Sequence, residues 1–166
     1  MKNVLMLWVS MLFIVATPNL LIAQWVQVNG PESAVVHCLT GYDSVVFAGT
    51  SWGGAFISSN SGNSWTPLGP GLMSRSVYSI EVDGTNLFIG TSSGLFHAND
   101  TSGPWTIDKS SFPDTGITAI AVDSGCVYAS TSSGVFISTD SGSTWKGVHA
   151  IPYITCMAVG QVFFSV

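Results

Sequence analysis

The sequence predicts an all-β fold of short strands, and three observations on its 166 residues indicate this. Glycine is frequent, with 18 copies, and serine, threonine, valine and phenylalanine are spread along the chain. That mixture favours strands and tight turns over helices. Charged residues make up only 8% of the sequence, against about 25% in ordinary soluble domains. Above all, a tryptophan recurs every 40 residues, at Trp25, Trp65, Trp105 and Trp145.

Each repeat contains four expected strands. In the second repeat, about 74–108, apolar and polar residues alternate between turn-forming segments. The first repeat, about 33–68, and the third, about 114–148, share this pattern. Four strands joined by tight turns every 40 residues are typical of a β-propeller blade, although a β-solenoid with shorter coils is the alternative. The expected strands are 35–39, 45–48, 55–58 and 65–68, then 77–82, 87–90, 95–98 and 105–107, then 117–122, 127–130, 135–138 and 145–148.

A turn motif ends at three of these tryptophans. Residues 138–145 read Ser-Thr-Asp-Ser-Gly-Ser-Thr-Trp, and residues 58–65 match them with an asparagine in place of the aspartate. Residues 98–105 are a degenerate copy. With this pattern, S/T-x-D-x-G-x-T-W, the chain resembles the Asp-box, or BNR-repeat, β-propellers of sialidases, sortilin-type receptors and xyloglucanases. It is most similar to the secreted photosystem II stability/assembly factor-like proteins.

We expect this motif to be structural. Asp140 can accept hydrogen bonds from amides of its own turn, Gly142 permits a positive φ, and Trp145 can bury its ring between blades. Asn60 accepts the same bonds without a charge, which suits a turn rather than a metal or catalytic site. No metal or cofactor is therefore expected. The residues assigned this structural role are Ser58, Asn60, Gly62, Trp65, Asp100, Trp105, Ser138, Asp140, Gly142 and Trp145.

The N-terminal residues 1–23 are expected to be a signal peptide. Lys2 precedes an apolar run over 4–16, and the segment ends in a small residue, Ala23. An uncleaved membrane anchor is the alternative, but the run falls short of the ~20 apolar residues of a span. No later segment is expected to cross a membrane. We therefore expect secretion to the periplasm, the cell surface or the exterior.

Residues 24–166 are expected to form part of a larger propeller. Residues 25–28 match the fourth strand of a blade, and propellers often close their ring with such a strand, which hides sheet edges. Residues 151–166 match half of a fourth repeat, with strands at 154–159 and 162–165. About three and a half blades are thus present. Because closed rings have about 4–8 blades, we expect a C-terminally truncated fragment of a ring of seven or so. A four-bladed ring is the alternative.

Composition excludes some functions. Four basic residues in the whole chain, with a net charge of -5, cannot build the basic face that nucleic acid requires. Three cysteines without CxxC spacing indicate neither a zinc site nor a disulfide framework, and are expected to be small buried apolar residues. Sialidases of the resembled group use three arginines, whereas this chain has one. No catalytic residue is assigned.

One binding site is expected from topology. Turns between the second and third strands of a blade share a face with the links between blades. This places Trp52 near Arg75. Trp52 breaks the repeat, because its counterparts are serines, and an exposed aromatic beside a cation could stack on a sugar or hold a peptide carboxylate. A Trp52 folded back on its own blade is the alternative.

Two functions remain. The first is a secreted, non-catalytic propeller that acts as a protein- or glycan-interaction or assembly scaffold. The second is a fragment of a carbohydrate-active propeller enzyme, whose catalytic residues lie outside this chain.

Overall fold

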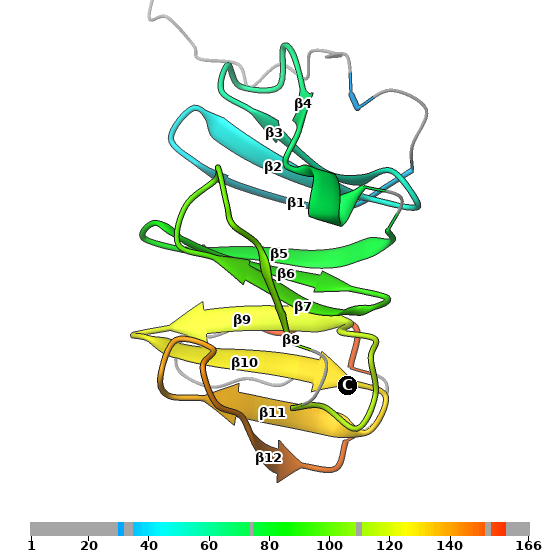
Figure 1. The fold of residues 1–166 in the computed structure, drawn as a ribbon, viewed down its shortest axis with the longest axis vertical. Coiled ribbons are helices and arrows are strands. Elements are labelled where there is room, and N and C mark those ends of the chain that lie inside the picture. Colours follow the sequence, from blue (N-terminus) through cyan, green and yellow to red (C-terminus); the bar gives the residue numbers. More distant parts are fainter. Residues whose placement is uncertain (1–29, 32–34, 74, 109–110, 152–153, 159–166) are drawn as a thin grey trace, which may run out of the picture.

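The protein consists of three stacked four-stranded antiparallel sheets (Figure 1). The computed structural model describes residues 30–31, 35–73, 75–108, 111–151 and 154–158. The expected signal peptide, 1–23, and the expected blade-closing strand, 25–28, lie outside the described residues. Among the described residues, no helix is both long and apolar enough to cross a membrane.

Within each sheet the strands pair in chain order, so each sheet is an up-and-down blade. This confirms the predicted fold class of four-stranded blades. A short 3₁₀ helix, η1 (Pro70–Leu72), lies in the link between the first two blades. The first blade contains β1 (Val36–Tyr42), β2 (Val45–Thr50), β3 (Gly54–Ser58) and β4 (Thr66–Pro67). The second contains β5 (Val77–Asp83), β6 (Asn86–Thr91), β7 (Gly94–Ala98) and β8 (Thr106–Asp108). The third contains β9 (Ala119–Asp123), β10 (Cys126–Thr131), β11 (Gly134–Ser138) and β12 (Lys146–His149).

Successive blades contact one another most closely through their first strands. β1 lies against β5, and β5 lies against β9 (Figure 1). One direct bond joins the last two: the amide of Ile120 donates to the hydroxyl of Ser79 over 3.1 Å. The chain therefore adds one blade after another in a single direction.

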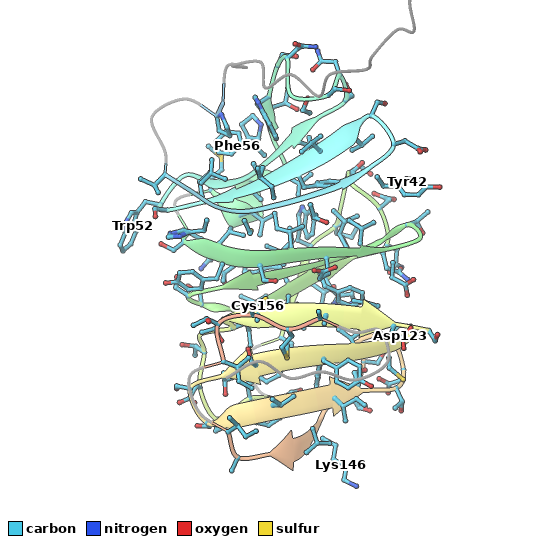
Figure 2. The ribbon with its side chains drawn as sticks, turned by 180° about the vertical axis from the view of Figure 1, so that it is seen from behind. Tyr42, Trp52, Phe56, Asp123, Lys146 and Cys156 are labelled. Carbon is cyan, nitrogen blue, oxygen red and sulfur yellow. The ribbon has the colours of Figure 1, made fainter. Side chains whose placement is uncertain are left out.

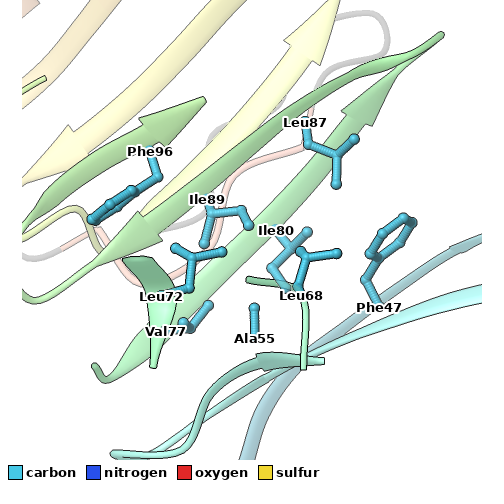
Figure 3. Packing of buried hydrophobic residues seen from close by; sticks show 9 residues of the cluster. All are labelled: Phe47, Ala55, Leu68, Leu72, Val77, Ile80, Leu87, Ile89 and Phe96. Carbon is cyan, nitrogen blue, oxygen red and sulfur yellow. The ribbon is translucent and has the colours of Figure 1, made fainter. Parts of the chain in front are cut away.

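The apolar core lies between blades rather than inside one blade. Between the first and second blades, Phe47 and Ala55 face Ile80 and Ile89 (Figure 3). Between the second and third blades, the corresponding layer contains buried residues of both. A blade thus buries its faces only when it has neighbours, as in other repeat proteins. The buried members of the second layer are Phe88, Leu95, Phe112, Ile117, Ile120, Val127 and Ala129.

The first blade has one uncovered face. Leu39 in β1 occupies the position that Ile80 occupies in β5 and Ile120 in β9, as the strand registers show. The exposed fraction is 3% for Ile80 and 2% for Ile120, but 64% for Leu39. Among the described residues no blade precedes β1, so this apolar position is at the surface there.

A fourth repeat begins on the third blade. Ile154 is buried, and its carbonyl accepts bonds from the hydroxyls of Thr118 (2.7 Å) and Ser130 (3.4 Å). The strand expected at 154–159 is not assigned over the described residues 154–158. A strand needs a partner, and the residues expected to pair with it, 162–165, lie outside the described residues.

Candidate binding surface

The turn between β11 and β12 is closed by its own side chains. The hydroxyl of Ser138 donates to Asp140 Oδ1 over 2.7 Å and accepts from the amide of Gly142 over 2.8 Å. Asp140 also accepts from the amide and the hydroxyl of Thr144, over 2.8 and 2.6 Å. Gly142 has φ 88°, and the Trp145 indole donates to its carbonyl over 3.1 Å. All these bonds remain inside the turn.

The turn between β3 and β4 has the same geometry without a charge. Asn60 Oδ1 accepts from the amide of Ser64 and from the hydroxyl of Ser58, each over 2.9 Å. The Asn60 amide group then donates to the hydroxyl of Ser64 over 2.9 Å. Gly62 has φ 87°. An amide therefore replaces the carboxylate here. Its side-chain bond runs in the opposite direction, because Asn60 donates to Ser64 whereas Asp140 accepts from Thr144.

The turn between β7 and β8 is simpler. Asp100 accepts from the amide of Ser102 over 2.8 Å and from its hydroxyl over 2.5 Å. Ala98 stands where the other turns have a buried serine, and the peptide between Gly103 and Pro104 is cis. This turn lacks the serine-centred bonds of the other two.

The hydrogen bonds to Asp140 predict that part of the protein's stability is lost in acid. The hydroxyl of Thr144, then its amide, then the hydroxyl of Ser138 lower the pKa of Asp140 from 3.8 to about 2. Because the folded-state pKa is the lower one, this carboxylate stabilises the fold above pH 4. The contribution is lost as the pH falls from about 4 through about 2. We expect Asp140→Asn to remove this part of the acid sensitivity and to fold normally, since Asn60 occupies the equivalent turn.

The measurement is the melting temperature of both proteins between pH 6 and pH 2. Above pH 4 the difference between the two melting temperatures should stay constant. Below pH 4 the melting temperature of the wild type should fall more steeply than that of the variant. A constant difference over the whole range would contradict the assignment. Asp100 and Asp114 also have lowered pKa values, held down by serine hydroxyls, and they cancel in this comparison because both proteins retain them.

In the second and third blades, a buried apolar residue of the preceding link lies in the same apolar layer as the repeat tryptophan, Trp105 or Trp145. Phe112 contacts Trp145 at 5.1 Å and Phe136 at 5.2 Å between ring centroids. Leu72, 40 residues earlier, is buried in the layer that contains Phe96. The first blade instead has a pocket of about 650 Å³, lined by Gly30, Pro31, Phe56, Asn63, Ser64, Trp65 and Pro67. The 40-residue spacing of Leu72 and Phe112 is the sequence signal that could have predicted these two buried residues.

Exposed apolar residues occur on chain segments of the first and second blades that meet near the turn carrying Trp52. Eight large apolar side chains are exposed among the described residues, and five of them belong to this group. Their exposed fractions reach 76% for Trp52, 67% for Val35 and 55% for Met73. Figure 2 shows Trp52 at the opposite end of the blade from Tyr42. We call this group the Trp52 surface; it consists of Val35, Val36, Trp52, Met73 and Tyr78.

Backbone contacts hold the group together. The amide of Ser51 donates to the carbonyl of Val35 over 2.9 Å, and the amide of Gly54 donates to the carbonyl of Arg75 over 3.1 Å. A Cβ atom on Gly54 would lie 2.2 Å from the carbonyl oxygen of Leu72, so the turn is pressed against the link. On the other side, the ring of His37 lies edge-on to Tyr78 at 5.7 Å.

The turn that carries Trp52 differs from its counterparts. It is one residue longer than the turns at 92–93 and 132–133, and Trp52 adopts φ 61°, a region that side-chain-bearing residues rarely occupy. In the third blade, the hydroxyl of Ser132 donates to Asp114 over 2.8 Å, and Ser133 bonds to the same carboxylate. In the third blade the serines of this turn are thus bonded to the link that precedes the blade, whereas Trp52 is 76% exposed and does not fold back on its blade.

Arg75 lies beside the Trp52 turn through its backbone only. Its guanidinium carbon lies 5.1 Å from the centre of the Phe96 ring in the second blade. Its Nε donates to the carbonyl of Gly71 over 2.9 Å. The structure therefore brings the two chain segments together as expected, but it directs the charge of Arg75 toward the second blade.

His37 and Ser51 form a pair that the sequence analysis did not anticipate. His37 Nε2 lies 2.5 Å from the hydroxyl of Ser51, a serine 14 residues away. A serine and an imidazole are two parts of a nucleophilic site. In the described part of the chain no carboxylate bonds to His37, and the amides of Ser51 and Gly53 are already bonded to carbonyls.

Metal and thiol chemistry receive no support in the described ranges. No group of three or more histidine, cysteine, aspartate or glutamate residues could hold a metal ion there. Burial raises the pKa of the Cys38 thiol to about 11, which disfavours the reactive thiolate. Cys38 and Cys126 are partly buried, but Cys156 is exposed, so the expectation of three buried cysteines is wrong for Cys156. The segment around Cys156 is covered by no strand of a fourth blade among the described residues.

Sequence comparison finds no match to any family description and no match among curated proteins. Solved structures are similar in fold. They include an ancestral GH74 enzyme, at 22% identity and TM-score 0.57, with 68% of this chain and 18% of that chain covered. YCF48 bound to a D1 peptide gives 16% identity, TM-score 0.62 and coverages of 72% and 41%.

A third similar structure is the extracellular domain of a one-component system from B. thetaiotaomicron, at 17% identity and TM-score 0.58, with coverages of 76% and 17%. These likenesses show that the chain has a β-propeller fold. The chain spans less than half the length of each of these three structures.

Proposed function

We propose that the protein is a secreted, non-catalytic β-propeller that binds a partner through the Trp52 surface and acts as an interaction scaffold. The observation that carries this proposal is the 76% exposure of Trp52, in a turn that is one residue longer than the equivalent turns of the other two blades. Exposed tryptophan and tyrosine side chains are the residues most often found at binding hot spots. Nothing in the blade packing requires a tryptophan there, since serines serve in the other two blades.

Cellular location and partner type follow from the N-terminal sequence and from the similar structures. The apolar N-terminal segment favours secretion, and one similar structure is an extracellular domain. Another similar structure, YCF48, is bound to a peptide. A protein partner is therefore the first choice, and a glycan is the competing outcome of the test.

A carbohydrate-active enzyme is the second candidate, because one similar structure is a GH74 enzyme. The described residues favour it less. Their serine–histidine pair lacks a third group, and the single arginine of the chain lies over Phe96. Hydrolysis of a polysaccharide by the purified protein would support this candidate and contradict the scaffold.

The prediction concerns partner capture. Proteins from the source's extracellular fraction are cross-linked to the wild type, and each captured protein is then purified and titrated. We expect Trp52→Ala to weaken that binary affinity at least about tenfold, as at other hot-spot tryptophans. Tyr42→Ala is the matched control, because Tyr42 is 71% exposed at the opposite end of the blade. Equal affinities for wild type and Trp52→Ala would overturn the proposal.

A further inference from the structure

We propose that Asn99, in the exposed turn between β7 and β8, is the attachment site of an N-linked glycan. The proposal concerns a site away from the Trp52 surface, and it rests on the part of the proposed function that concerns secretion. Residues 99–101 read Asn-Asp-Thr, which is the N-x-S/T acceptor pattern with a middle residue other than proline. No other asparagine in the sequence has a serine or threonine two positions later.

The structure exposes the whole acceptor triplet. Asn99, Asp100 and Thr101 are all exposed, and they follow the buried Ala98 at the end of β7. A glycan is bulky and hydrated, so its attachment site must lie at the surface. None of the three residues belongs to the apolar layers between the blades. A glycan at this turn therefore requires no change in the packing of the blades.

The two groups on which glycan transfer depends are free. In the described part of the chain, neither the side-chain amide of Asn99 nor the hydroxyl of Thr101 takes part in a hydrogen bond. The carboxylate of Asp100, which stands between them in the sequence, instead accepts from the amide and the hydroxyl of Ser102. The amide is thus available to the sugar, and the hydroxyl is available to the enzyme that recognises the triplet.

The other exposed asparagines of the described residues, Asn60 and Asn63, have a structural role that Asn99 lacks. Asn60 bonds to two serines of its turn, and the Asn63 side chain donates to the carbonyl of Asn60 over 2.8 Å. The residues equivalent to Asn99 in the other two turns are Ser59 and Thr139, so the turn itself does not require an asparagine there. Attachment of a glycan gives this asparagine a role that turn formation does not.

The transfer is a substitution at the anomeric carbon of a lipid-pyrophosphate-linked oligosaccharide. The side-chain nitrogen of Asn99 forms a bond to that carbon, and the bond from the carbon to the phosphate oxygen breaks. The lipid pyrophosphate leaves with the electron pair, and the nitrogen loses one proton to a base of the transferring enzyme. The protein therefore supplies only the acceptor, and the export pathway supplies the donor and the enzyme.

A glycan at Asn99 leaves the Trp52 surface open. Asp100 and Thr101 line the same small hollow as Tyr42. Figure 2 shows Tyr42 at the opposite end of the first blade from Trp52. The modification and the proposed binding surface thus lie at opposite ends of the blades. Because only 8% of the residues are charged, a glycan would add substantially to the hydration of the protein.

The experiment follows Asn99 in the full chain, produced in the source and recovered from its extracellular fraction. Peptide N-glycosidase in heavy-oxygen water cleaves an N-linked glycan and leaves a labelled aspartate at the attachment site, which peptide mass spectrometry locates. We expect the label at position 99 and faster migration in gel electrophoresis after the treatment. Asn99→Gln and Thr101→Ala should lose the glycan completely, whereas Thr101→Ser, which keeps a hydroxyl, and Asn63→Gln should retain it.

The threonine variants separate recognition of the triplet from a defect in folding, because the Thr101 hydroxyl makes no bond within the described residues. An unlabelled position 99 in the wild type overturns the inference, in whichever fraction the protein is found. A glycan that persists in Thr101→Ala overturns it as well, since attachment would not depend on the triplet. The same fractionation shows whether the protein leaves the cell, and so tests secretion separately from the glycan.

Discussion

Replacing Ile80 with aspartate is expected to unfold the protein, whereas the same replacement at Leu39 is expected to leave it folded. The two residues occupy the same position in their blades. Ile80 is buried between the first and second blades, against Phe47 and Ala55. An aspartate there would place an unpaired carboxylate in an apolar layer, at a cost of about 4 kcal/mol or more, a large part of the 5–15 kcal/mol that stabilises a typical domain.

Leu39 is mostly solvent-exposed, so its replacement should change stability by no more than about 0.5 kcal/mol. Urea unfolding followed by circular dichroism checks both variants. If Leu39→Asp destabilised the protein as strongly as Ile80→Asp, then another part of the protein or a partner would cover β1 in solution. The pair therefore measures, with chemically identical changes, how much a preceding blade contributes to burial.

Much of the blade architecture could be predicted because the repeat fixes which residues align. The spacing of the tryptophans placed all twelve strands within a few residues of their observed bounds. The shortest, β4, covers only 66–67 of the expected 65–68. There Trp65 belongs to the preceding turn, and the proline at 67 has no amide to donate to a neighbouring strand.

The repeat could not predict what covers each position. Leu39 reads as a core residue by alignment with Ile80, yet its burial depends on a neighbouring blade that the local sequence does not reveal. The His37–Ser51 pair depends on the register between β1 and the end of β2, where a β-bulge between Val36 and Cys38 shifts the pairing. Arg75 was placed correctly along the chain, but its side chain follows the aromatic ring of Phe96, a contact that no sequence spacing encodes.

The second large effect is expected at Gly90, where the second blade meets the third. A Cβ atom on Gly90 would lie 2.9 Å from Ile117 Cγ2 and 3.0 Å from the Ile117 carbonyl oxygen. The first contact is closer than packed atoms tolerate, and the second is tight and involves the backbone, so the blades would have to separate slightly. Gly90→Ala should therefore destabilise the protein by about 1–3 kcal/mol, the usual cost of overpacking a core.

Gly116 provides the matched control. It lies in the same link as Ile117, and a Cβ atom there would meet nothing within 4 Å, so Gly116→Ala should stay within about 0.5 kcal/mol of the wild type. In the third blade the residue equivalent to Gly90 is Ser130, whose hydroxyl donates to the Ile154 carbonyl over 3.4 Å. Urea unfolding distinguishes the two cases. Equal small losses for both variants would mean that neighbouring blades shift freely, and that the close approach at Gly90 does not set their spacing.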